Sequence, residues 1–275
     1  MEKSLFADCI LLNFLRDRQV KASVQVWNDE SVDWSQFDVI IMKTPWDYVK
    51  KIDAFNVWLD KLEQLNVRVL NPIDTIRWNT NKAYLRDLER KNVTIPHTIW
   101  FETTDTIDIA DIFDQLKTDK IIIKPWVSST AHNTYALTRE EAALKVDEIN
   151  DLLKVKALMA QPFLDEVQTV GEYSVLFFNG KYSHAVLKTP KAGDFRVQYD
   201  YGGIINQVQP PARLLASAQY IVDNFAKGCL YTRVDGLNVN GEFTVMELEM
   251  IEPNLFLDKS EGSYQRYYDA IQALL

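Results

Sequence analysis

The sequence has little cysteine, no dense positive charge and no long apolar run. Its two cysteines, Cys9 and Cys229, are too few for a disulfide framework and predict a reducing compartment. No segment approaches the roughly 18 consecutive apolar residues of a membrane helix. The net charge is −9 and lysine and arginine do not cluster. Nucleic acid and anionic membrane surfaces are therefore not expected as partners.

The beginning of the chain also lacks the features of a secretion signal. Asp8 and Asn13 interrupt its apolar part, and no small-residue cleavage site follows. Leu5, Leu12 and Leu15 fall near helical spacing, which predicts an amphipathic helix. We therefore expect a cytoplasmic protein.

Several common motifs of nucleotide sites and hydrolases are absent as well. The chain has no Walker A lysine loop, no Gly-x-Gly-x-x-Gly and no Gly-x-Ser-x-Gly. Its three histidines, His97, His132 and His184, show no metal-ligand spacing. A catalytic site in this chain must therefore be built from other residues.

What the chain does have is enough length and apolar content for a large core. With 275 residues, of which 47% are hydrophobic, it predicts two or three lobes rather than one. In residues 1–72 a helix is followed by strands at 22–26 and 39–42, a second helix and a strand at 67–70. This alternation predicts a small parallel α/β lobe.

Ligands bind beyond the carboxyl ends of the strands in such sheets. Trp46 and Tyr48 follow one predicted strand, and Asn71 follows another. Packing and substrate contact are equally good interpretations of the two aromatic side chains. We expect substrate specificity to depend on this region, around Trp46, Asp47 and Asn71, and on residues 188–196.

The rest of the chain mixes helices with antiparallel hairpins. A capping box begins at Thr138, and Asn179-Gly180 joins two apolar runs as a hairpin turn. The predicted helices lie at 73–91 with a break near Trp78-Asn79, 107–116, 138–153, 211–225 and 264–275, and the predicted strands at 120–124, 134–137, 157–161, 172–178 and 181–189.

A second hairpin, within residues 231–257, carries the most informative charges. Its two apolar runs flank an Asn240-Gly241 turn signal. Glu247 and Glu249 share one face of the second run because side chains alternate along a strand. Asp235 joins that face only if the loop has three residues or the hairpin has an equivalent bulge. A two-residue turn alone places Asp235 on the opposite face.

Three carboxylates on one face repel one another unless a cation lies among them. Hard oxygen ligands suit Mg²⁺, which keeps several waters and usually takes a few protein carboxylates plus substrate phosphates. Asp235, Glu247 and Glu249 therefore predict a magnesium site. A solvated acidic strand is the alternative interpretation.

Other charged residues suit a ligand that carries phosphate. Lys124 ends a buried-looking strand, where it either holds a phosphate or extends its charge into water. Glu172 heads an apolar strand, either as a functional acid or as an exposed strand end. Arg233 shares a face with Asp235, so it pairs with that carboxylate or stabilises an oxyanion near a metal. Arg196 is a fixed cation in a loop near this hairpin in sequence.

These motifs follow one another in a specific order. They are Asn81-Lys82, Lys124-Pro125 with its loop, Gln161-Pro162-Phe163-Leu164, Gly171-Glu172-Tyr173-Ser174-Val175, the Arg196 loop, Arg233-Val234-Asp235-Gly236 and Glu247-Leu248-Glu249. Over essentially the whole chain, this order resembles the ATP-grasp superfamily, on the branch of glutathione synthetase and the D-alanine–D-alanine ligases. Pro45-Trp46-Asp47-Tyr48 and Gly193-Asp194-Phe195-Arg196-Val197-Gln198 are similar to proteins related to the D-cycloserine-forming O-ureido-serine cyclo-ligase.

The resemblance implies a fold of mixed α/β and α+β class, in which two α+β lobes clasp ATP. It implies an N-terminal lobe at residues 1–72, a small lobe at 73–161 that includes a lid around 126–133, and a large lobe at 162–275 that carries the metal hairpin. The implied roles are phosphate binding by Lys82 and Lys124, the adenine hinge by Gln161, Phe163 and Leu164, ribose or phosphate contact by Glu172, Mg²⁺ binding by Asp235, Glu247 and Glu249, and contact with the transferred phosphoryl group and the acyl-phosphate oxygen by Arg233 and Arg196.

Two features depart from the family pattern. The loop at residues 126–133 contains no glycine, although relatives are usually glycine-rich there, and this disfavours close backbone approach to phosphates. Relatives also open with a β-strand before the first helix. This sequence begins almost in that helix, so we expect the N-terminal lobe to lack a strand.

We therefore expect an ATP- and Mg²⁺-dependent ligase that activates a small carboxylate as an acyl phosphate for attack by an amine or similar nucleophile. One alternative is an intramolecular cyclo-ligase that acts on an amino-acid-like substrate. The other is a catalytically weak nucleotide-binding protein, which the two departures favour. The expected partners are ATP and a small carboxylate or amino-acid-like substrate. A homodimer is compatible with the sequence, which does not fix the oligomeric state.

Overall fold

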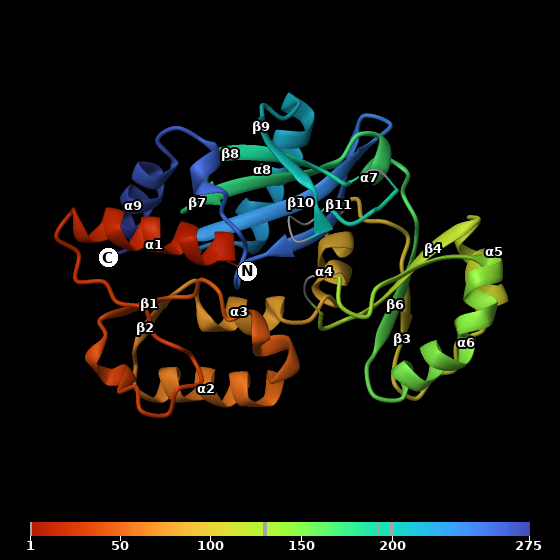
Figure 1. Cartoon of the computed structure of the whole chain (residues 1–275), viewed down its shortest axis with the longest axis horizontal. Helices are drawn as coiled ribbons and strands as arrows, with labels where there is room; N and C mark the ends of the chain where they lie inside the picture. Colours follow the sequence, from red (N-terminus) through yellow and green to blue (C-terminus); the bar gives the residue numbers. More distant parts are fainter. Residues whose placement is uncertain (1, 129–130, 192, 198–200) are drawn as a thin grey trace.

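Three β-sheets with helices packed around them make up the molecule (Figure 1). The computed structural model describes residues 2–128, 131–191, 193–197 and 201–275. No helix in these ranges is both long and apolar enough to cross a membrane. The predicted domain boundaries at 72/73 and 161/162 stay a prediction.

The N-terminal lobe contains a two-stranded parallel sheet, β1 (Val39–Ile41) and β2 (Arg68–Leu70). The remaining elements of this lobe are α1 (Glu2–Arg16), η1 (Trp34–Gln36), η2 (Trp46–Lys50) and α2 (Ile52–Gln64). The parallel α/β pattern is confirmed, but the strand predicted at residues 22–26 is wrong. Val24 and Val26 there are 72% and 60% exposed. Their β-branched side chains favour extended backbone, yet a strand also needs a neighbouring strand, and among the described residues none pairs with this segment.

The small lobe has a four-stranded antiparallel sheet with two helices on one face. Its strands are β3 (Ile99–Phe101), β4 (Lys120–Pro125), β5 (Tyr135–Thr138) and β6 (Leu158–Pro162), and its helices are α5 (Ile109–Leu116) and α6 (Arg139–Leu153). The predicted capping box of Thr138 is confirmed. Ile121 and Ile123 pack under the helices. Side chains alternate along β4, so Ile122 and Lys124 face the other way, toward the large lobe.

The large lobe is built on a five-stranded antiparallel sheet. Its strands are β7 (Glu172–Phe178), β8 (Lys181–Thr189), β9 (Ile204–Val208), β10 (Tyr231–Val239) and β11 (Glu242–Glu249), and its helical elements are α7 (Glu166–Thr169), α8 (Ala212–Phe225), η4 (Leu257–Lys259) and α9 (Ser263–Leu274). The sequence did not predict β9, an edge strand with mostly exposed side chains and therefore no apolar alternation. One face of the sheet packs against α8. The opposite face packs at one end against α1 and α9. The rest of that face carries charged side chains.

The two hairpins of this sheet each combine a two-residue Asn-Gly turn with a bulge. In the second hairpin Val239 pairs with Glu242, so only Asn240 and Gly241 form the turn, and both have positive φ. Of the alternatives that the sequence left open, the hairpin therefore has the two-residue turn rather than the three-residue loop. The register shifts between Asp235 and Gly236, and Asp235 pairs with Glu247. An extra residue in a strand reverses the face toward which all later side chains point. This bulge therefore places Asp235 on the same face as Glu247 and Glu249, as a three-residue loop would have done.

Two helices between the lobes anchor the acidic strand β11. The predicted break in residues 73–91 is confirmed as the gap between α3 (Ile73–Asn79) and α4 (Tyr84–Arg90). Asn79 lies at this gap. Its amide nitrogen donates to the Leu248 carbonyl at 2.7 Å and its amide oxygen accepts from the Met250 N–H at 2.8 Å. The Tyr84 hydroxyl accepts from the Leu248 N–H at 2.9 Å. These bonds satisfy the outer edge of β11, which would otherwise be free to pair with another strand.

Asn71 joins the N-terminal lobe to the same hairpin. Its buried amide nitrogen donates to the carbonyls of Tyr231 and Met250, each at 2.8 Å. The Tyr231 N–H donates to the Asn71 amide oxygen at 3.2 Å. Asn71 therefore uses its polar atoms to connect β10 with the end of β11. Its side chain is fully buried by these bonds and does not line the cavity, so the predicted dependence of substrate specificity on the region around Asn71 stays a prediction.

We predict that Gly236→Ala destabilises the protein because this glycine lies at the bulge with no room for a side chain. A Cβ there would lie 2.5 Å from a ring carbon of Phe243 and 2.6 Å from the Thr244 carbonyl oxygen. The expected loss in free energy of unfolding is about 1–3 kcal/mol, measured by urea unfolding followed through tryptophan fluorescence. Adding Phe243→Leu removes one of the two clashes, so the double variant should lose less than the sum of the single variants. Strict additivity would contradict this account of the bulge.

Candidate active site

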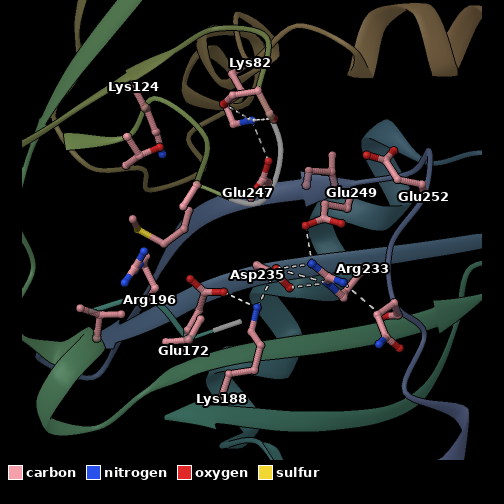
Figure 2. A pocket seen from close by; sticks show the side chains of 18 of the residues that line it. Lys82, Lys124, Glu172, Lys188, Arg196, Arg233, Asp235, Glu247, Glu249 and Glu252 are labelled. Carbon is pink, nitrogen blue, oxygen red and sulfur yellow. Dashed lines mark hydrogen bonds and ion pairs between the residues drawn. The ribbon is translucent and has the colours of Figure 1, made fainter. Parts of the chain in front are cut away.

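A cavity of about 970 Å³ lies over the charged face of the large sheet, where all three lobes meet. Its apolar lining includes Ile122, Phe163, Leu164, Val197 and Met246. Its charged lining includes Lys82, Lys124, Glu172, Lys188, Arg196, Arg233, Asp235, Glu247, Glu249 and Glu252 (Figure 2). Trp46 and Tyr48 of η2 line it from the N-terminal lobe. A cavity with an apolar part and a dense set of charges suits a ligand that has the same two parts.

Arg233 and Asp235 form the centre of the charged face. The Arg233 Nε donates to Asp235 Oδ1 at 2.9 Å, and its Nη2 donates to Asp235 Oδ2 at 2.9 Å. The same guanidinium is paired with Glu249, which lies directly opposite Arg233 across the two strands. The predicted sharing of one face by Asp235, Glu247 and Glu249 therefore occurs, through the bulge. Burial raises the pKa of Asp235, but Arg233 and Lys188 outweigh burial and lower this pKa to about 2.

Lys188 is a second buried cation of this face, and the sequence did not identify it as a site residue. It is 5% exposed, its Nζ lies 3.0 Å from Asp235 Oδ2, and it is ion-paired with Glu172. Lys188 pairs with Glu172 across β7 and β8 only because a bulge near Phe177 shifts that hairpin by one residue. A regular two-residue turn would have placed Lys188 on the other face. The sequence identified Glu172 as a candidate acid. It gave no sign of the bulge that brings Lys188 onto the same face.

Lys82 connects the acidic strand with the segment after β4. It lies between α3 and α4, and its Nζ is 2.9 Å from Glu247 Oε1. The same Nζ donates to the Ser128 carbonyl at 2.8 Å. The predicted lid at 126–133 is described on both sides, while its residues 129–130 lie outside the described residues. Lys82 is thus held between the carboxylate face and the beginning of that segment.

Lys124 faces the cavity from β4 of the small lobe. Burial lowers the pKa of Lys124 to about 8, and the nearby charge of Glu247 only partly offsets this. No ion pair within 4 Å joins Lys124 to a carboxylate in the described part of the chain, in contrast to Lys82, Lys188 and Arg233. Its ammonium group is therefore the buried cation of this site most available to an incoming anion.

Glu249 shows that the carboxylate face carries excess negative charge. Burial raises its pKa; the cation of Arg233 opposes this, but Glu247 and Asp235 raise the pKa further, to about 7. No three Asp, Glu, His or Cys side chains are set as a ready metal-ligand group in the ranges that the structure describes. The donor set nevertheless fits Mg²⁺, because Asp235, Glu247 and Glu249 offer hard oxygens on one face that is short of positive charge.

The three residues of the predicted adenine hinge differ in their exposure to the cavity. Phe163 and Leu164 line the cavity after β6, and the Phe163 ring lies 6.0 Å from that of Phe195. Gln161 is different. It is 1% exposed, does not line the cavity, and its amide nitrogen donates to the Thr98 hydroxyl at 2.9 Å. Gln161 pairs with Ile122 across the strands and so shares its sheet face, and the Gln161 amide oxygen has no hydrogen-bond partner among the described residues. The predicted place of Gln161 in the hinge stays a prediction.

Arg196 lines the cavity, but lies apart from the other predicted catalytic arginine. Its guanidinium is held by Asp194, with Nη2 to Oδ2 at 2.7 Å, and stacks 3.8 Å above the Tyr201 ring. In Figure 2, Glu172 and Asp235 are drawn between Arg196 and Arg233. Side-chain hydrogen bonds from Arg196 hold the pKa of Asp194 well below its usual range. In the described arrangement Arg196 therefore does not share the centre of the site with Arg233.

The aromatic residues after β1 have separate roles. Asp47 accepts from the Trp27 indole at 2.7 Å and from Lys51 at 2.7 Å, so its side chain supports the N-terminal lobe rather than the cavity. Trp46 and Tyr48 both line the cavity. The positions of Trp46 and Tyr48 are therefore compatible with substrate contact. The Asp47 side chain does not line the cavity.

We predict that nucleotide affinity falls above pH 8 because of Lys124. This lysine is cationic below its pKa of about 8 and neutral above it. Above pH 8, phosphate binding to the cationic form therefore requires uptake of a proton from solution. The dissociation constant for ADP is measured by calorimetry between about pH 7 and pH 9.5. Above the pKa of Lys124 it should rise by up to about tenfold per pH unit. In Lys124→Arg the guanidinium stays charged throughout, so this rise should disappear. Equal slopes in both proteins would contradict the assignment.

The comparisons with known proteins agree with this architecture. Residues 88–256 match the family described as prokaryotic glutathione synthetase, ATP-grasp domain, and residues 4–71 match the family described as D-cycloserine synthetase DcsG, N-terminal domain. The chain is 27% identical over 277 residues to the cycloserine biosynthesis protein DcsG of Streptomyces lavendulae, covering 95% of this chain and 91% of that protein.

Solved structures show the same fold. The crystal structure of D-cycloserine synthetase DcsG matches with a TM-score of 0.85 at 25% identity, covering 96% of this chain and 93% of the other. D-alanine–D-alanine ligase from Bacillus anthracis complexed with ATP matches with a TM-score of 0.61 at 16% identity, covering 83% and 81%. The predicted ATP-grasp fold and the predicted resemblance are therefore confirmed. The chain belongs to the ATP-grasp family of the prokaryotic glutathione synthetase type, and it is an ATP-dependent ligase.

Proposed function

We propose that this ligase uses ATP and Mg²⁺ to activate a small carboxylate as an acyl phosphate, which an amine or similar nucleophile then attacks. One observation carries the proposal. On a single face of the cavity, Asp235, Glu247 and Glu249 alternate with the buried cations Lys82 and Arg233. Phosphoryl transfer needs little covalent help from a protein, and depends mainly on charges positioned around the phosphates.

The two parts of the cavity match the two parts of ATP. The apolar side chains Ile122, Phe163, Leu164 and Met246 suit the adenine ring. The cations of the cavity suit the phosphates, with Lys124 the one that has no carboxylate within ion-pair distance in the described chain. Asp235, Glu247 and Glu249 would hold Mg²⁺, whose charge would neutralise phosphate oxygens.

The reaction then has two balanced steps. A substrate carboxylate oxygen attacks the γ-phosphorus of ATP, and the bond to the β-phosphate oxygen breaks, so that ADP leaves. The nucleophile next attacks the acyl carbon, loses a proton and expels inorganic phosphate. Arg233 stabilises the charge that develops on the phosphoryl and acyl oxygens, because it lies beside Glu249 and remains protonated. Lys82 and the segment that it holds at Ser128 exclude water from the acyl phosphate.

A cyclo-ligase is the second candidate, in which the attacking group belongs to the same substrate molecule. The observation that favours it is the match of the N-terminal lobe, residues 4–71, to the N-terminal domain of D-cycloserine synthetase DcsG. This lobe contributes Trp46 and Tyr48 to the cavity. A shared first lobe supports a shared manner of holding a small substrate. A cytoplasmic location, expected from the sequence, suits either reaction.

Hydroxylamine provides the test of acyl-phosphate chemistry. We expect ADP release from ATP only when a carboxylate substrate is added, in a screen of free amino acids, their 2-hydroxy counterparts and small peptides. Hydroxylamine should then trap the activated carboxylate as a hydroxamate, because it attacks acyl phosphates directly. A cyclo-ligase would instead form, without hydroxylamine, a product lighter than its substrate by one water. ADP release that is independent of every added carboxylate would refute the proposal.

Glu249→Ala tests the proposed metal face. We expect this variant to lose carboxylate-dependent ADP release by on the order of 100-fold or more, since one of the proposed Mg²⁺ ligands is removed, while its circular dichroism spectrum stays that of the wild type. Glu242→Ala is the matched control, because Glu242 lies on the same strand but pairs with the exposed Arg213. It should keep full turnover. Unchanged turnover in Glu249→Ala would exclude Glu249 from the site.

A further inference from the structure

One carboxylate of the cavity has no cation of its own. Glu172, Asp235, Glu247 and Glu249 are each ion-paired with a lysine or arginine. Glu252 also lines the cavity, but its carboxylate makes no ion pair and no hydrogen bond within the described residues. Figure 2 draws it beyond Glu249, on the side away from Lys124 and Arg196. It therefore lies on the opposite side of the metal face from the small lobe.

The cations nearest in the structure are already engaged elsewhere. Arg233 binds Asp235 and Glu249, and its Nη1 donates to the Asn254 carbonyl at 3.1 Å. Lys43, which follows β1, lies 3.5 Å from Asp8 of α1. Lys82 and Arg233 only partly oppose the raised pKa of Glu252, and no lysine or arginine of the described residues lies within 4 Å of its carboxylate.

The surroundings of Glu252 are aromatic and belong to the N-terminal lobe. The Trp46 indole nitrogen donates to the Glu252 carbonyl at 3.4 Å. Burial raises the pKa of Tyr48, and the charge of Glu252 contributes next after burial. Trp46 and Tyr48 both face the cavity. Aromatic faces and a carboxylate are together the groups that attract an ammonium ion.

We propose that Glu252 binds the ammonium group of an amino-acid substrate, with Trp46 and Tyr48 beside it. This inference rests on the proposed function and deepens it by naming a residue that determines specificity for the ammonium group of the substrate. Arg233 and Glu252 line the same cavity, and Figure 2 draws Glu252 next to Glu249, so a substrate whose carboxylate lies beside Arg233 can direct a nearby ammonium toward Glu252. Burial of Glu252 without a counter-charge is costly, as the raised pKa of this carboxyl from burial and from Glu249 indicates. An ammonium ion supplies that counter-charge, whereas a neutral hydroxyl does not.

The test compares matched substrates in the wild type and in Glu252→Gln. Each amino acid, in both enantiomers, is paired with its 2-hydroxy counterpart in the hydroxylamine assay. For the wild type we expect kcat/KM to favour the amino acid by on the order of 100-fold, because a site built for a polar group rejects the analogue that lacks its partner. In Glu252→Gln this preference should fall below about tenfold, mainly through a higher KM for the amino acid. Glu261→Gln, an exposed change outside the cavity, should keep the full preference.

A binding measurement separates failure of this inference from failure of the proposed function. The melting temperature of the ADP-bound protein is followed with serine, as either enantiomer, and with glycerate, which lacks only the ammonium. Stabilisation by serine but not glycerate, lost in Glu252→Gln, supports the subsite even if no turnover is found.

Three results would overturn the proposal. The first is equal use or equal binding of the amino and hydroxy acids by the wild type. The second is equal loss of both substrates in Glu252→Gln, which would indicate a structural role. The third is a changed Mg²⁺ requirement in Glu252→Gln with an unchanged amino-acid preference, which would assign Glu252 to the metal face instead. Carboxylate-independent ADP release, in contrast, refutes only the proposed function.

Discussion

The site depends on one extra residue in the strand that carries its acids. Because Asn240-Gly241 is a two-residue turn, a regular hairpin would turn Glu247 and Glu249 away from Asp235. The bulge opposite Gly236 reverses their facing, so that all three carboxylates and Arg233 share the cavity face. Gly236 permits this geometry, since a Cβ there would lie 2.5 Å from the Phe243 ring. The first hairpin repeats this arrangement and brings Lys188 opposite Glu172.

Charge compensation explains why this face is stable without a ligand. A buried carboxylate is costly unless it is paired. Arg233 and Lys188 together satisfy Asp235, which therefore stays ionised, while Glu249 shares Arg233 with it and has its pKa raised to about 7. Because the acids outweigh the cations on this face, a bound cation would stabilise it. A ligase that must bind a metal and a polyanion together gains from such an arrangement, because each can take over charges that the protein now pairs internally.

The position of the acidic strand is determined by parts of the chain far away in sequence. Asn79 and Tyr84 bond to the edge of β11, and Asn71 bonds to its end and to β10. These bonds also place Lys82 beside Glu247 and bring the aromatic residues after β1 to the far side of the cavity. The N-terminal lobe is thus fixed to the catalytic sheet by buried polar contacts. Its residues are well placed to decide which substrate is accepted.

The sequence by itself determined most of the order of helices and strands, the two Asn-Gly turns and most of the charged residues that line the cavity, since these depend on local periodicity, turn chemistry and motif order. The tertiary structure alone decided facing and pairing. Neither bulge has a residue signature, so Lys188 was missed and the facing of Asp235 was left open. The buried Gln161 amide nitrogen finds its partner in the hydroxyl of Thr98, which is distant in sequence. Glu252 became notable only when every neighbouring acid proved to have a cation, and such a difference exists only between residues that folding brings together.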